Sequence, residues 1–269
     1  MLPHRGCIIV GVLNVTPDSF FDGGRFASAE AAVEAGVRMA GEGAHWVDIG
    51  GESTRPGATP VPEEEEKARV VPVVEGLRGR LPAGVRISVD TYKSGTARAA
   101  LSAGATIVND VSGGLLDPAI LGAAAESGAT IVVGHLRGAP ATMMERISFA
   151  DVVAEVGAEL VERIAAARRA GCREIWADPG IGFGKRIEHN LALLRALPEL
   201  GARVGVPLLV GVSRKAFLGH LTGKPAAERQ FGTAAAVTIA VLRGAAAVRV
   251  HDVGAARDVV AVAEALSRD

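Results

Sequence analysis

Short apolar runs, each ending in a polar or glycine-rich stretch, recur along the whole chain. The runs are rich in β-branched residues, as expected of strands that a parallel sheet buries on both faces. Ala-rich segments with helical spacing lie between them, for example residues 29–41, 61–80, 149–170 and 255–267. The eight predicted strands are residues 7–14, 46–50, 86–90, 106–110, 130–135, 174–180, 207–215 and 246–252.

This alternation predicts parallel strands joined by right-handed crossovers, and eight such units close a barrel. Several strands follow a Gly-Ala turn of the kind that stops a helix, as at Gly43, Gly104 and Gly128. Four glutamates follow Pro62, which is typical of a helix start rather than of a metal site. No linker, repeat or low-complexity tract divides the sequence. We therefore predict one α/β domain, a (β/α)8 TIM barrel, over residues 1–269.

An open doubly wound sheet that binds a dinucleotide is the main rival architecture. Such a sheet usually carries a G-x-G-x-x-G loop directly after its first strand, whereas the first strand here runs into Asn14-Val-Thr-Pro-Asp. The later stretch at residues 180–185 resembles a phosphate loop. It fails the P-loop spacing, because Pro179 and Arg186 stand where Gly and Ser or Thr belong. Nucleotide binding is therefore disfavoured.

Composition supports one buried domain and excludes several classes of partner. Hydrophobic residues make up 49% of the chain and aromatic residues only 4%, so we expect a mainly aliphatic core. The formal net charge of -1 gives no reason to expect a nucleic acid or a membrane as partner. Cys7 and Cys172 cannot form a disulfide framework, and the N-terminal stretch lacks the plan of a signal peptide. We therefore expect a cytoplasmic protein.

Polar residues stand at or just past the predicted strand ends. In a barrel these positions converge on the C-terminal mouth, where active sites lie. A single aspartate there is more often a helix N-cap, which could explain Asp48 or Asp110 alone but not the whole set. The set is Asn14, Asp48, Asp90, Asn109, His135, Asp178, Ser213, Lys215, Arg249 and His251.

The residue types at this rim suggest a flat nitrogen heterocycle as ligand. Asp90 and Asp178 can accept ring N–H groups, and the Asn109 amide can both accept and donate. A carboxylate takes two parallel N–H groups, as a 2-amino-pyrimidinone offers them. Lys215 adds a charge suited to a ring carbonyl or ring nitrogen. The alternative for Lys215 is an internal ion pair with a carboxylate.

A second group at the rim suits diphosphate. Arg249 and His251 stand two apart on the last strand, so both can point into the mouth, where barrels often bind phosphate. A lone histidine is more often structural, but its pairing with Arg249 favours function. With Arg55 and the oxygen of Asn14, these residues predict a site for diphosphate and Mg²⁺. Two long loops at residues 14–25 and 50–60 leave the same rim and are predicted to close over it.

Seven phrases of the sequence match one enzyme family in order. They begin at Asn14 (NVTPDSF, then DGG), Gly51 (GESTRPG), Ser88 (SVDT), Val108 (VNDVSG), Asp178 (DPGIGFGK), Gly211 (GVSRK) and Arg249 (RVHDV). Together they resemble dihydropteroate synthase, a family of folate biosynthesis, over nearly the whole chain. The resemblance implies that p-aminobenzoate is joined to 6-hydroxymethyl-7,8-dihydropterin diphosphate, with release of diphosphate and use of Mg²⁺.

The resemblance also implies a role for each matching residue. The pterin-binding set would be Asp90, Asn109, Asp178 and Lys215, with Thr54 as a further substrate contact. The diphosphate ligands would be Arg55, Arg249 and His251, and the Mg²⁺ ligand would be Asn14. The p-aminobenzoate pocket would be formed by Phe20, Pro56, Phe183 and Arg214. The residues expected to act directly in the reaction are Asp90, Lys215, Arg249 and His251.

The expected chemistry needs no covalent enzyme intermediate. The electron-rich dihydropterin can lose diphosphate to leave a delocalised cation, which the aryl amine attacks, so orientation and electrostatic stabilisation should dominate. The resemblance also implies a homodimer, formed through helices away from the rim, and a sulfonamide target. Two alternatives are a binding-only pterin protein and a pterin-dependent methyltransferase domain, neither of which would require the Arg-x-His pair.

Overall fold

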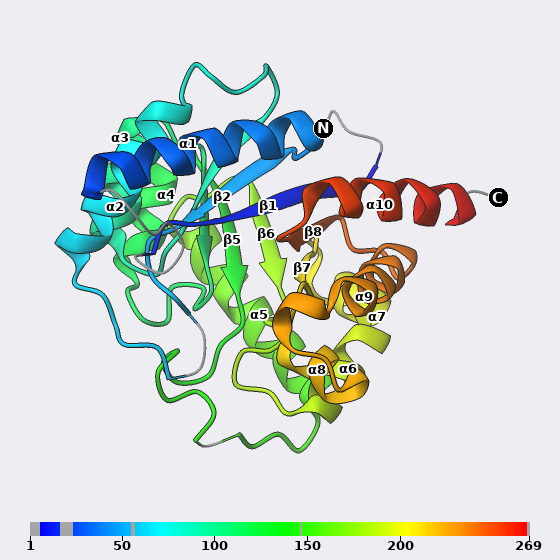
Figure 1. Ribbon diagram of the computed structural model, residues 1–269. Coiled ribbons are helices and arrows are strands. Elements are labelled where there is room, and N and C mark those ends of the chain that lie inside the picture. Colours follow the sequence, from blue (N-terminus) through cyan, green and yellow to red (C-terminus); the bar gives the residue numbers. More distant parts are fainter. Residues whose placement is uncertain (1–5, 17–23, 55–56, 146, 268–269) are drawn as a thin grey trace.

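Eight parallel strands at the centre of the protein are wrapped by helices on the outside (Figure 1). The computed structural model describes residues 6–16, 24–54, 57–145 and 147–267, with the side chains of 24–28 left out. The described residues form one sheet in the order β6-β5-β4-β3-β2-β1-β8-β7. The strands are β1 (Ile8–Asn14), β2 (Trp46–Gly50), β3 (Arg86–Asp90), β4 (Ile107–Asp110), β5 (Thr130–Gly134), β6 (Ile175–Asp178), β7 (Leu209–Gly211) and β8 (Ala247–Val250).

The barrel closes between β6 and β7 by a weaker seam than elsewhere. Ala177 forms a single bridge with Leu208, and its backbone N–H donates to the carbonyl of Pro207 at 3.0 Å. The other neighbouring strands pair over several residues. The predicted TIM barrel is therefore confirmed.

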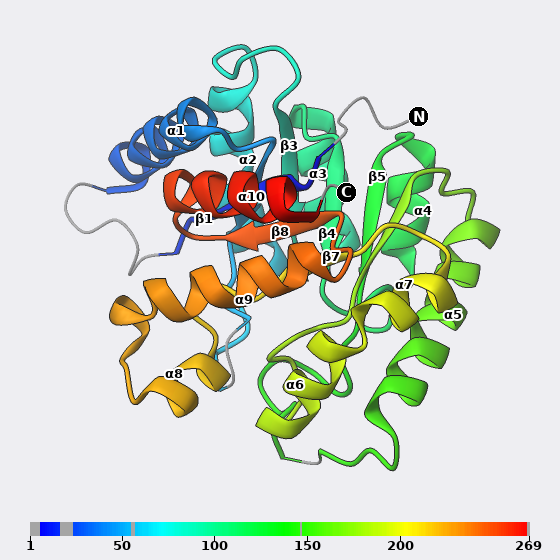
Figure 2. The same cartoon turned by 90° about the vertical axis from the view of Figure 1, so that its right-hand side faces the viewer.

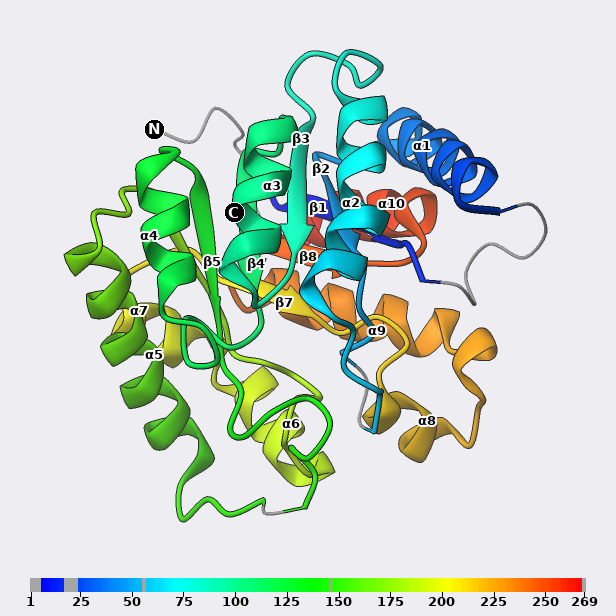
Figure 3. The ribbon, with the colours of Figure 1, turned by 90° about the vertical axis from the view of Figure 1, so that its left-hand side faces the viewer.

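A helix or helix pair follows each strand and covers the outside of the barrel, as the views from two sides show (Figures 2 and 3). Alanines and branched aliphatic side chains fill the layer between these helices and the sheet. The helices are α1 (Gly24–Glu42), α2 (Glu63–Leu77), α3 (Ser94–Ala103), α4 (Ala119–Glu126), α5 (Val152–Arg169), α6 (Ile187–Arg195), α7 (Leu197–Val204), α8 (Ala216–Thr222), α9 (Gln230–Leu242) and α10 (Val253–Ser267), with a short 3-10 turn η2 (Ala226–Glu228).

All eight predicted strands are present, and the predicted Gly-Ala turns stop helices as expected. Gly43, Gly104 and Gly128 have positive φ angles of 111°, 127° and 64°, which glycine adopts without steric cost. The seventh strand is shorter than predicted, because the backbone turns at Arg214, whose φ is 56°. Lys215 then precedes α8 directly.

The barrel interior differs from the expected aliphatic core. Its floor is formed by inward-facing residues of the strands, and it contains both tryptophans. Trp46 and Trp176 meet edge to face, with ring centroids 5.0 Å apart. Two large rings fill the floor of the barrel, so the space above them, at the strand ends, is left to polar side chains.

Candidate active site

The inward-facing rows of the barrel change from apolar to polar toward the C-terminal ends of the strands. Side chains two apart on a strand point to the same side. Residues two positions beyond the tryptophans of the floor are Asp48 on β2 and Asp178 on β6. In the same way, Ile107 is followed by Asn109 on β4. The strand parity therefore places these side chains in a polar interior layer above the floor, in which Asp48 lies two residues deeper in register than Asn109.

Asp48, Asp90, Asn109 and Arg249 form one connected cluster in this layer. The guanidinium of Arg249 donates from Nε to Asp48 Oδ2 and from Nη2 to Asp90 Oδ2, both at 2.6 Å. Asn109 Nδ2 donates to Asp48 Oδ2 at 2.9 Å. Asp48 therefore belongs to the barrel interior and caps no helix. The helix-cap alternative also fails for Asp110, which accepts the backbone N–H groups of Ser112 and Gly114 in its own turn.

Two carboxylate oxygens of the cluster are left unsatisfied by the residues that the structure describes. Asp48 Oδ1 and Asp90 Oδ1 are buried and have no hydrogen-bond partner within the described part of the chain. Buried polar atoms are nearly always satisfied, and an unsatisfied one is costly. The cluster is therefore suited to receive N–H donors from a ligand.

Burial changes the ionisation of two aspartates of this layer, Asp90 and Asp178. Burial raises the pKa of Asp90 to about 7; Arg249 opposes the shift, and the charge of Asp48 adds to it. Burial also raises the pKa of Asp178, against the backbone N–H of Gly180, which donates to Asp178 Oδ1 at 2.7 Å. Partial burial acts to lower the pKa of Arg249, but Asp48 and Asp90 raise it above its usual value, so Arg249 stays cationic.

The glycine loop at residues 179–185 turns its carbonyls inward around a buried lysine. Lys185 is 2% exposed, and its Nζ contacts the carbonyls of Gly180 and Phe183 at 3.0 Å and that of His135 at 3.2 Å. A Cβ atom on Gly180 would lie 1.9 Å from the carbonyl oxygen of His135, so this position requires glycine. A phosphate loop instead presents N–H groups to an anion. The interpretation that this stretch does not bind phosphate is consistent with this geometry.

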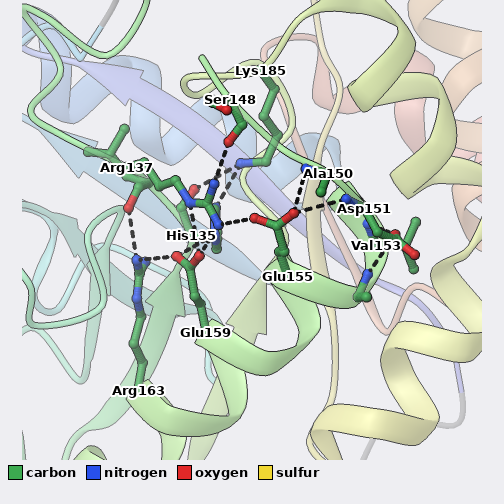
Figure 4. Close-up of polar contacts among 12 residues, drawn as sticks. His135, Arg137, Ser148, Ala150, Asp151, Val153, Glu155, Glu159, Arg163 and Lys185 are labelled. Carbon is green, nitrogen blue, oxygen red and sulfur yellow. Dashed lines mark hydrogen bonds and ion pairs between the residues drawn. The ribbon is translucent and has the colours of Figure 1, made fainter. Parts of the chain in front are cut away.

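Lys185 also leads to an ionic network on α5 that the sequence did not reveal (Figure 4). Its Nζ lies 2.9 Å from Nδ1 of His135, whose Nε2 lies 3.1 Å from Glu159 Oε2. Glu159 also pairs with Arg137, which reaches Glu155 at 2.7 Å. His135, one of the predicted rim residues, is thus fully buried and structural. Burial lowers the pKa of His135 to about 4 despite the contact with Glu159, so its ring is neutral at pH 7.

Lys215 and Phe183 lie together beside this loop. Nζ of Lys215 is 4.1 Å from the centroid of the Phe183 ring. A Cβ atom on Gly182 would lie 3.0 Å from Cδ of Lys215, so the glycine makes room for the lysine. The charge of Lys215 acts on both Asp90 and Asp178. Lys215 therefore stands between the predicted pterin and p-aminobenzoate sets.

His251, Arg214 and Asn14 occupy other parts of the same rim. Nδ1 of His251 lies 3.0 Å from the hydroxyl of the buried Ser213. Arg214 is exposed, and Arg229 holds its carbonyl at 2.9 Å. A Cβ atom on Gly50 would lie 3.8 Å from Asn14 Oδ1 and 3.7 Å from Asp90 Oδ2. Asn14, Gly50 and Asp90 are also neighbours in register across three strands.

The loop that follows β2, the second of the two predicted long loops, is anchored at its start by another network, which the sequence analysis did not predict. Glu52 is 7% exposed and accepts from the hydroxyl of Tyr92 at 2.7 Å and from Lys93. Lys93 also reaches Glu66 of α2 at 2.8 Å. In the sequence, this network is visible only as an acidic residue after β2, Glu52, and a basic residue after β3, Lys93. Charged residues after strands are too common for this pair to predict a contact. Thr54 follows this anchor and is half-buried.

Three predicted residues cannot be placed. Phe20, Arg55 and Pro56 lie outside the described residues. Among the other predicted residues, Arg249 contacts Asp90 directly and is joined to Asn109 through Asp48. A second group lies around the adjacent glycine loop and consists of Asp178, Lys215 and Phe183. Within the described ranges, no group of three or more His, Cys, Asp or Glu side chains could hold a metal ion. The same ranges contain no helix long and apolar enough to cross a membrane.

The chain is similar in sequence and fold to known proteins of one family. The family described as pterin binding enzyme matches residues 10–251. A dihydropteroate synthase of Synechocystis is 46% identical, over 97% of this chain and 90% of its own length. A Xanthomonas albilineans dihydropteroate synthase solved with 4-aminobenzoic acid is 46% identical, has a TM-score of 0.90, and covers 98% and 94% of the two chains. A Yersinia pestis dihydropteroate synthase in a sulfonamide complex is 40% identical, with a TM-score of 0.90 and coverage of 97% and 94%.

Proposed function

This chain belongs to the pterin-binding enzyme family, and we propose that it acts as a dihydropteroate synthase. It condenses 6-hydroxymethyl-7,8-dihydropterin diphosphate with p-aminobenzoate to give 7,8-dihydropteroate and diphosphate. The observation that carries the proposal is the buried cluster in which Arg249 and Asn109 meet Asp48 and Asp90 at the barrel mouth. A cation beside carboxylates with unsatisfied oxygens suits a substrate that combines an N–H-rich ring with an anionic leaving group.

Asp178, Asp90 and Asn109 bind the pterin ring in this proposal. Support comes from their common position in the interior layer and from the unpartnered Asp90 Oδ1, which needs a donor. Asp178 is held by the backbone N–H of Gly180 through one oxygen, which leaves its other oxygen for a ring N–H. Lys215, beside Phe183, provides the positive charge for a ring carbonyl or ring nitrogen. Thr54, at the start of the second loop, adds a further contact.

Arg249 and His251 receive the diphosphate. The contacts of Arg249 with Asp48 and Asp90 use two of the five N–H donors of a guanidinium, so others can meet phosphate oxygens. Its side chain is 18% exposed, which gives the group access from the mouth. His251 is held at Nδ1 by the hydroxyl of Ser213, which fixes the orientation of its ring at the barrel mouth. Arg55 completes the set.

Asn14 is the residue proposed to hold Mg²⁺. Asn14 stands at the same register level as Asp90, on the barrel mouth. Its side-chain amide offers an oxygen atom, the kind of ligand that Mg²⁺ prefers. A site with one protein oxygen fits this ion, which usually takes its other ligands from substrate phosphates and water. When bound, Mg²⁺ would neutralise charge on the diphosphate.

The p-aminobenzoate pocket is assigned to Phe183 and Arg214, with Phe20 and Pro56. Phe183 offers an aromatic face beside Lys215, and Arg214 is an exposed cation that can meet the carboxylate of the amine substrate. The Xanthomonas relative was solved with 4-aminobenzoic acid and the Yersinia relative with a sulfonamide. Sulfonamides should therefore compete with p-aminobenzoate here.

The residues act by orientation and electrostatics. Arg249 and His251 stabilise the charge that develops on the departing diphosphate. The carboxylates of Asp90 and Asp178 hold the ring so that its methylene carbon faces the amine. Buried carboxylates also stabilise the delocalised cation that remains after diphosphate has left. The lone pair of the neutral amine then forms the new C–N bond to the methylene carbon, and the amine proton passes to the released diphosphate or to water.

The proposal is tested by measuring diphosphate release from the pterin diphosphate, with and without p-aminobenzoate, and by identifying the product. We expect 7,8-dihydropteroate in stoichiometric amount with diphosphate when both substrates and Mg²⁺ are present. Tight pterin binding without product would instead indicate a binding-only protein. Methyl transfer to a cobalamin acceptor would indicate a methyltransferase domain. Asp178→Asn should weaken both the pterin and its diphosphate, and an unchanged pterin affinity would contradict that assignment.

A homodimer is part of the same proposal. Support comes from α9 and α10, which lie side by side (Figure 2) and carry exposed apolar side chains. Phe231 is 82% exposed and shares one face of α9 with Leu242, while Leu266 of α10 is 73% exposed. Phe231→Glu should therefore shift the molar mass in light scattering from dimer toward monomer. Val161→Glu on α5 is the matched control, and an equal shift in both variants would contradict this interface.

We also propose a cytoplasmic location. Support comes from Cys7 and Cys172, which are both buried and unpaired, as expected in a reducing compartment. Fractionation of cells that express the tagged chain tests this, and recovery from the membrane or the medium would contradict it.

A further inference from the structure

We propose that Asp48 is a positioning residue that determines which atoms the pterin pocket offers to its ligand. It directs the Asn109 amide so that the amide oxygen is turned away from Asp48 and offered to the ligand, and it holds the Arg249 guanidinium in place. This inference rests on the proposed function, because it concerns how that same site selects a pterin.

The position of Asp48 makes this role possible. It is fully buried in the middle of β2, two residues before Gly50, whose register neighbours are Asn14 and Asp90. Asp48 thus lies one step deeper in the barrel than the rim. A group at this depth can hold the side chains nearer the rim without occupying the mouth itself.

One oxygen of Asp48 fixes two residues from different strands. Oδ2 accepts from Asn109 Nδ2 of β4 at 2.9 Å and from Arg249 Nε of β8 at 2.6 Å. Arg249 continues to Asp90 on β3 at 2.6 Å. Four strands of the barrel are therefore tied together through Asp48 at one level. The three residues it connects, directly or through Arg249, are all proposed substrate contacts.

The chemistry of a carboxylate decides the orientation of the Asn109 amide. An ionised carboxylate only accepts hydrogen bonds, whereas an amide has one donating and one accepting end. If the amide rotated, its oxygen would face Asp48 Oδ2 at hydrogen-bond distance, and two acceptors would repel each other. Asp48 therefore fixes the nitrogen of Asn109 toward the barrel floor. Oδ1 of Asn109 is therefore the end turned toward a ligand, with the second N–H of Nδ2 at its side.

The result is a pocket that presents acceptors to its ligand. Asn109 Oδ1 joins the unpartnered Asp90 Oδ1 and the second oxygen of Asp178. A 2-amino-pyrimidinone edge offers N–H donors to such a set, but an edge in which an oxo group replaces the amine offers an acceptor. A site built from buried acceptors should reject that analogue strongly, because both partners would be left unsatisfied.

The test compares two ligands on the full-length protein: 6-hydroxymethyl-7,8-dihydropterin and its 2-oxo analogue, a lumazine. The variants are Asp48→Leu, which has a similar shape and no acceptor, and Asp48→Asn, which keeps one oxygen that can accept from both Asn109 and Arg249. Binding is measured by calorimetry, and folding by thermal unfolding. Asp110→Asn is the matched control, because Asp110 is an equally buried strand-end carboxylate whose side-chain hydrogen bonds, among the described residues, come from its own turn.

In Asp48→Leu the preference for pterin over lumazine should fall at least about tenfold, because the released amide can rotate to donate. Asp48→Asn should retain most of the preference, and Asp110→Asn should retain all of it even where its melting temperature drops. An unchanged preference in Asp48→Leu would overturn the inference, since a purely structural role weakens both ligands equally. A loss in Asp48→Asn equal to that in Asp48→Leu would also overturn it, because charge and not amide orientation would then be responsible.

The wild-type protein separates this inference from the function on which it rests. A wild type that binds neither ligand overturns the proposed function, and the inference falls with it. A wild type that prefers the pterin and forms dihydropteroate, together with an unchanged preference in Asp48→Leu, overturns the inference alone.

Discussion

The Nζ atom of Lys185 lies 2.9 Å from Nδ1 of His135, and both side chains are buried behind the glycine loop. Since Nε2 of His135 faces Glu159, the ring carries its proton on Nε2 and accepts from Lys185 at Nδ1. Nζ of Lys185 also lies within hydrogen-bond distance of three backbone carbonyls, two of them from the loop at residues 179–185. This contact therefore ties the loop that presents Asp178 and Phe183 to α5, the helix that carries Glu159.

Replacing this lysine should loosen the loop and the site together. Lys185→Met keeps the aliphatic stem but leaves the carbonyls of Gly180 and Phe183 without their donor, at a cost of about 3 kcal/mol in the free energy of unfolding. We expect KM for both substrates to rise at least about tenfold, because the loop flanks both proposed pockets. Urea unfolding and steady-state kinetics measure the two effects. The exposed Lys224→Met is the control and should stay within about 0.5 kcal/mol of wild type.

The neutral His135 should make stability depend on pH. Burial lowers its pKa from 6.5 to about 4, so between these values the unfolded chain binds a proton that the folded protein does not. Stability due to this residue therefore falls as the pH drops from about 6.5 to about 4, by up to about 1.4 kcal/mol per pH unit.

The His135 effect must be isolated by difference, because Asp90 has a raised pKa and acts in the opposite direction over much of the same range. His135→Gln keeps a donor for Glu159 and cannot titrate. Urea unfolding between pH 4.5 and 7 should show that the advantage of wild type over His135→Gln shrinks on acidification. A constant difference would show that His135 does not change its charge on unfolding.

Pterin binding should strengthen as the pH rises through about 7. Burial raises the pKa of Asp90 to about 7, and only its ionised form can accept with both oxygens. Below that pH the proton must leave before a ligand N–H can bind, so affinity should drop by up to about tenfold per pH unit. Calorimetry from pH 5.5 to 8.5 measures the slope. Asp90→Asn should bind more weakly and with little pH dependence, so a full slope in that variant would assign the titration to another group.

Arg249→Ala should weaken the diphosphate-bearing substrate far more than the bare pterin. Loss of the guanidinium removes a direct phosphate contact, so we expect about a hundredfold weaker binding of the diphosphate and only a few-fold change for the pterin. The melting temperature should also fall, because Asp48 and Asp90 lose their shared cation. Arg249→Lys keeps the charge but cannot bridge both carboxylates, and should give an intermediate loss. Equal losses for both ligands would place Arg249 against the ring instead.

The fold could be predicted in advance because its signals are local. Each apolar run and each Gly-Ala turn can be identified without knowing the rest of the chain, and their alternation permits few topologies. The seventh strand shows the limit: a strand was predicted over residues 207–215, whose first six residues are apolar or glycine, yet the strand ends at Gly211 and the backbone turns at Arg214. Arg229, from a distant segment, stabilises that turn through two carbonyls.

The sequence by itself determined the barrel and the rim on which Asn14, Asp90, Asn109, Asp178, Lys215, Arg249 and His251 stand. It did so because strand-end positions of a parallel barrel converge whatever the side chains are. The tertiary structure alone decided the partners. It placed Asp48 under Asn109 and Arg249, and buried His135 against Lys185. A hydrogen bond forms only when donor and acceptor are placed to within a few tenths of an ångström. Here the partners come from strands that are far apart in sequence, and no local pattern encodes their relative position.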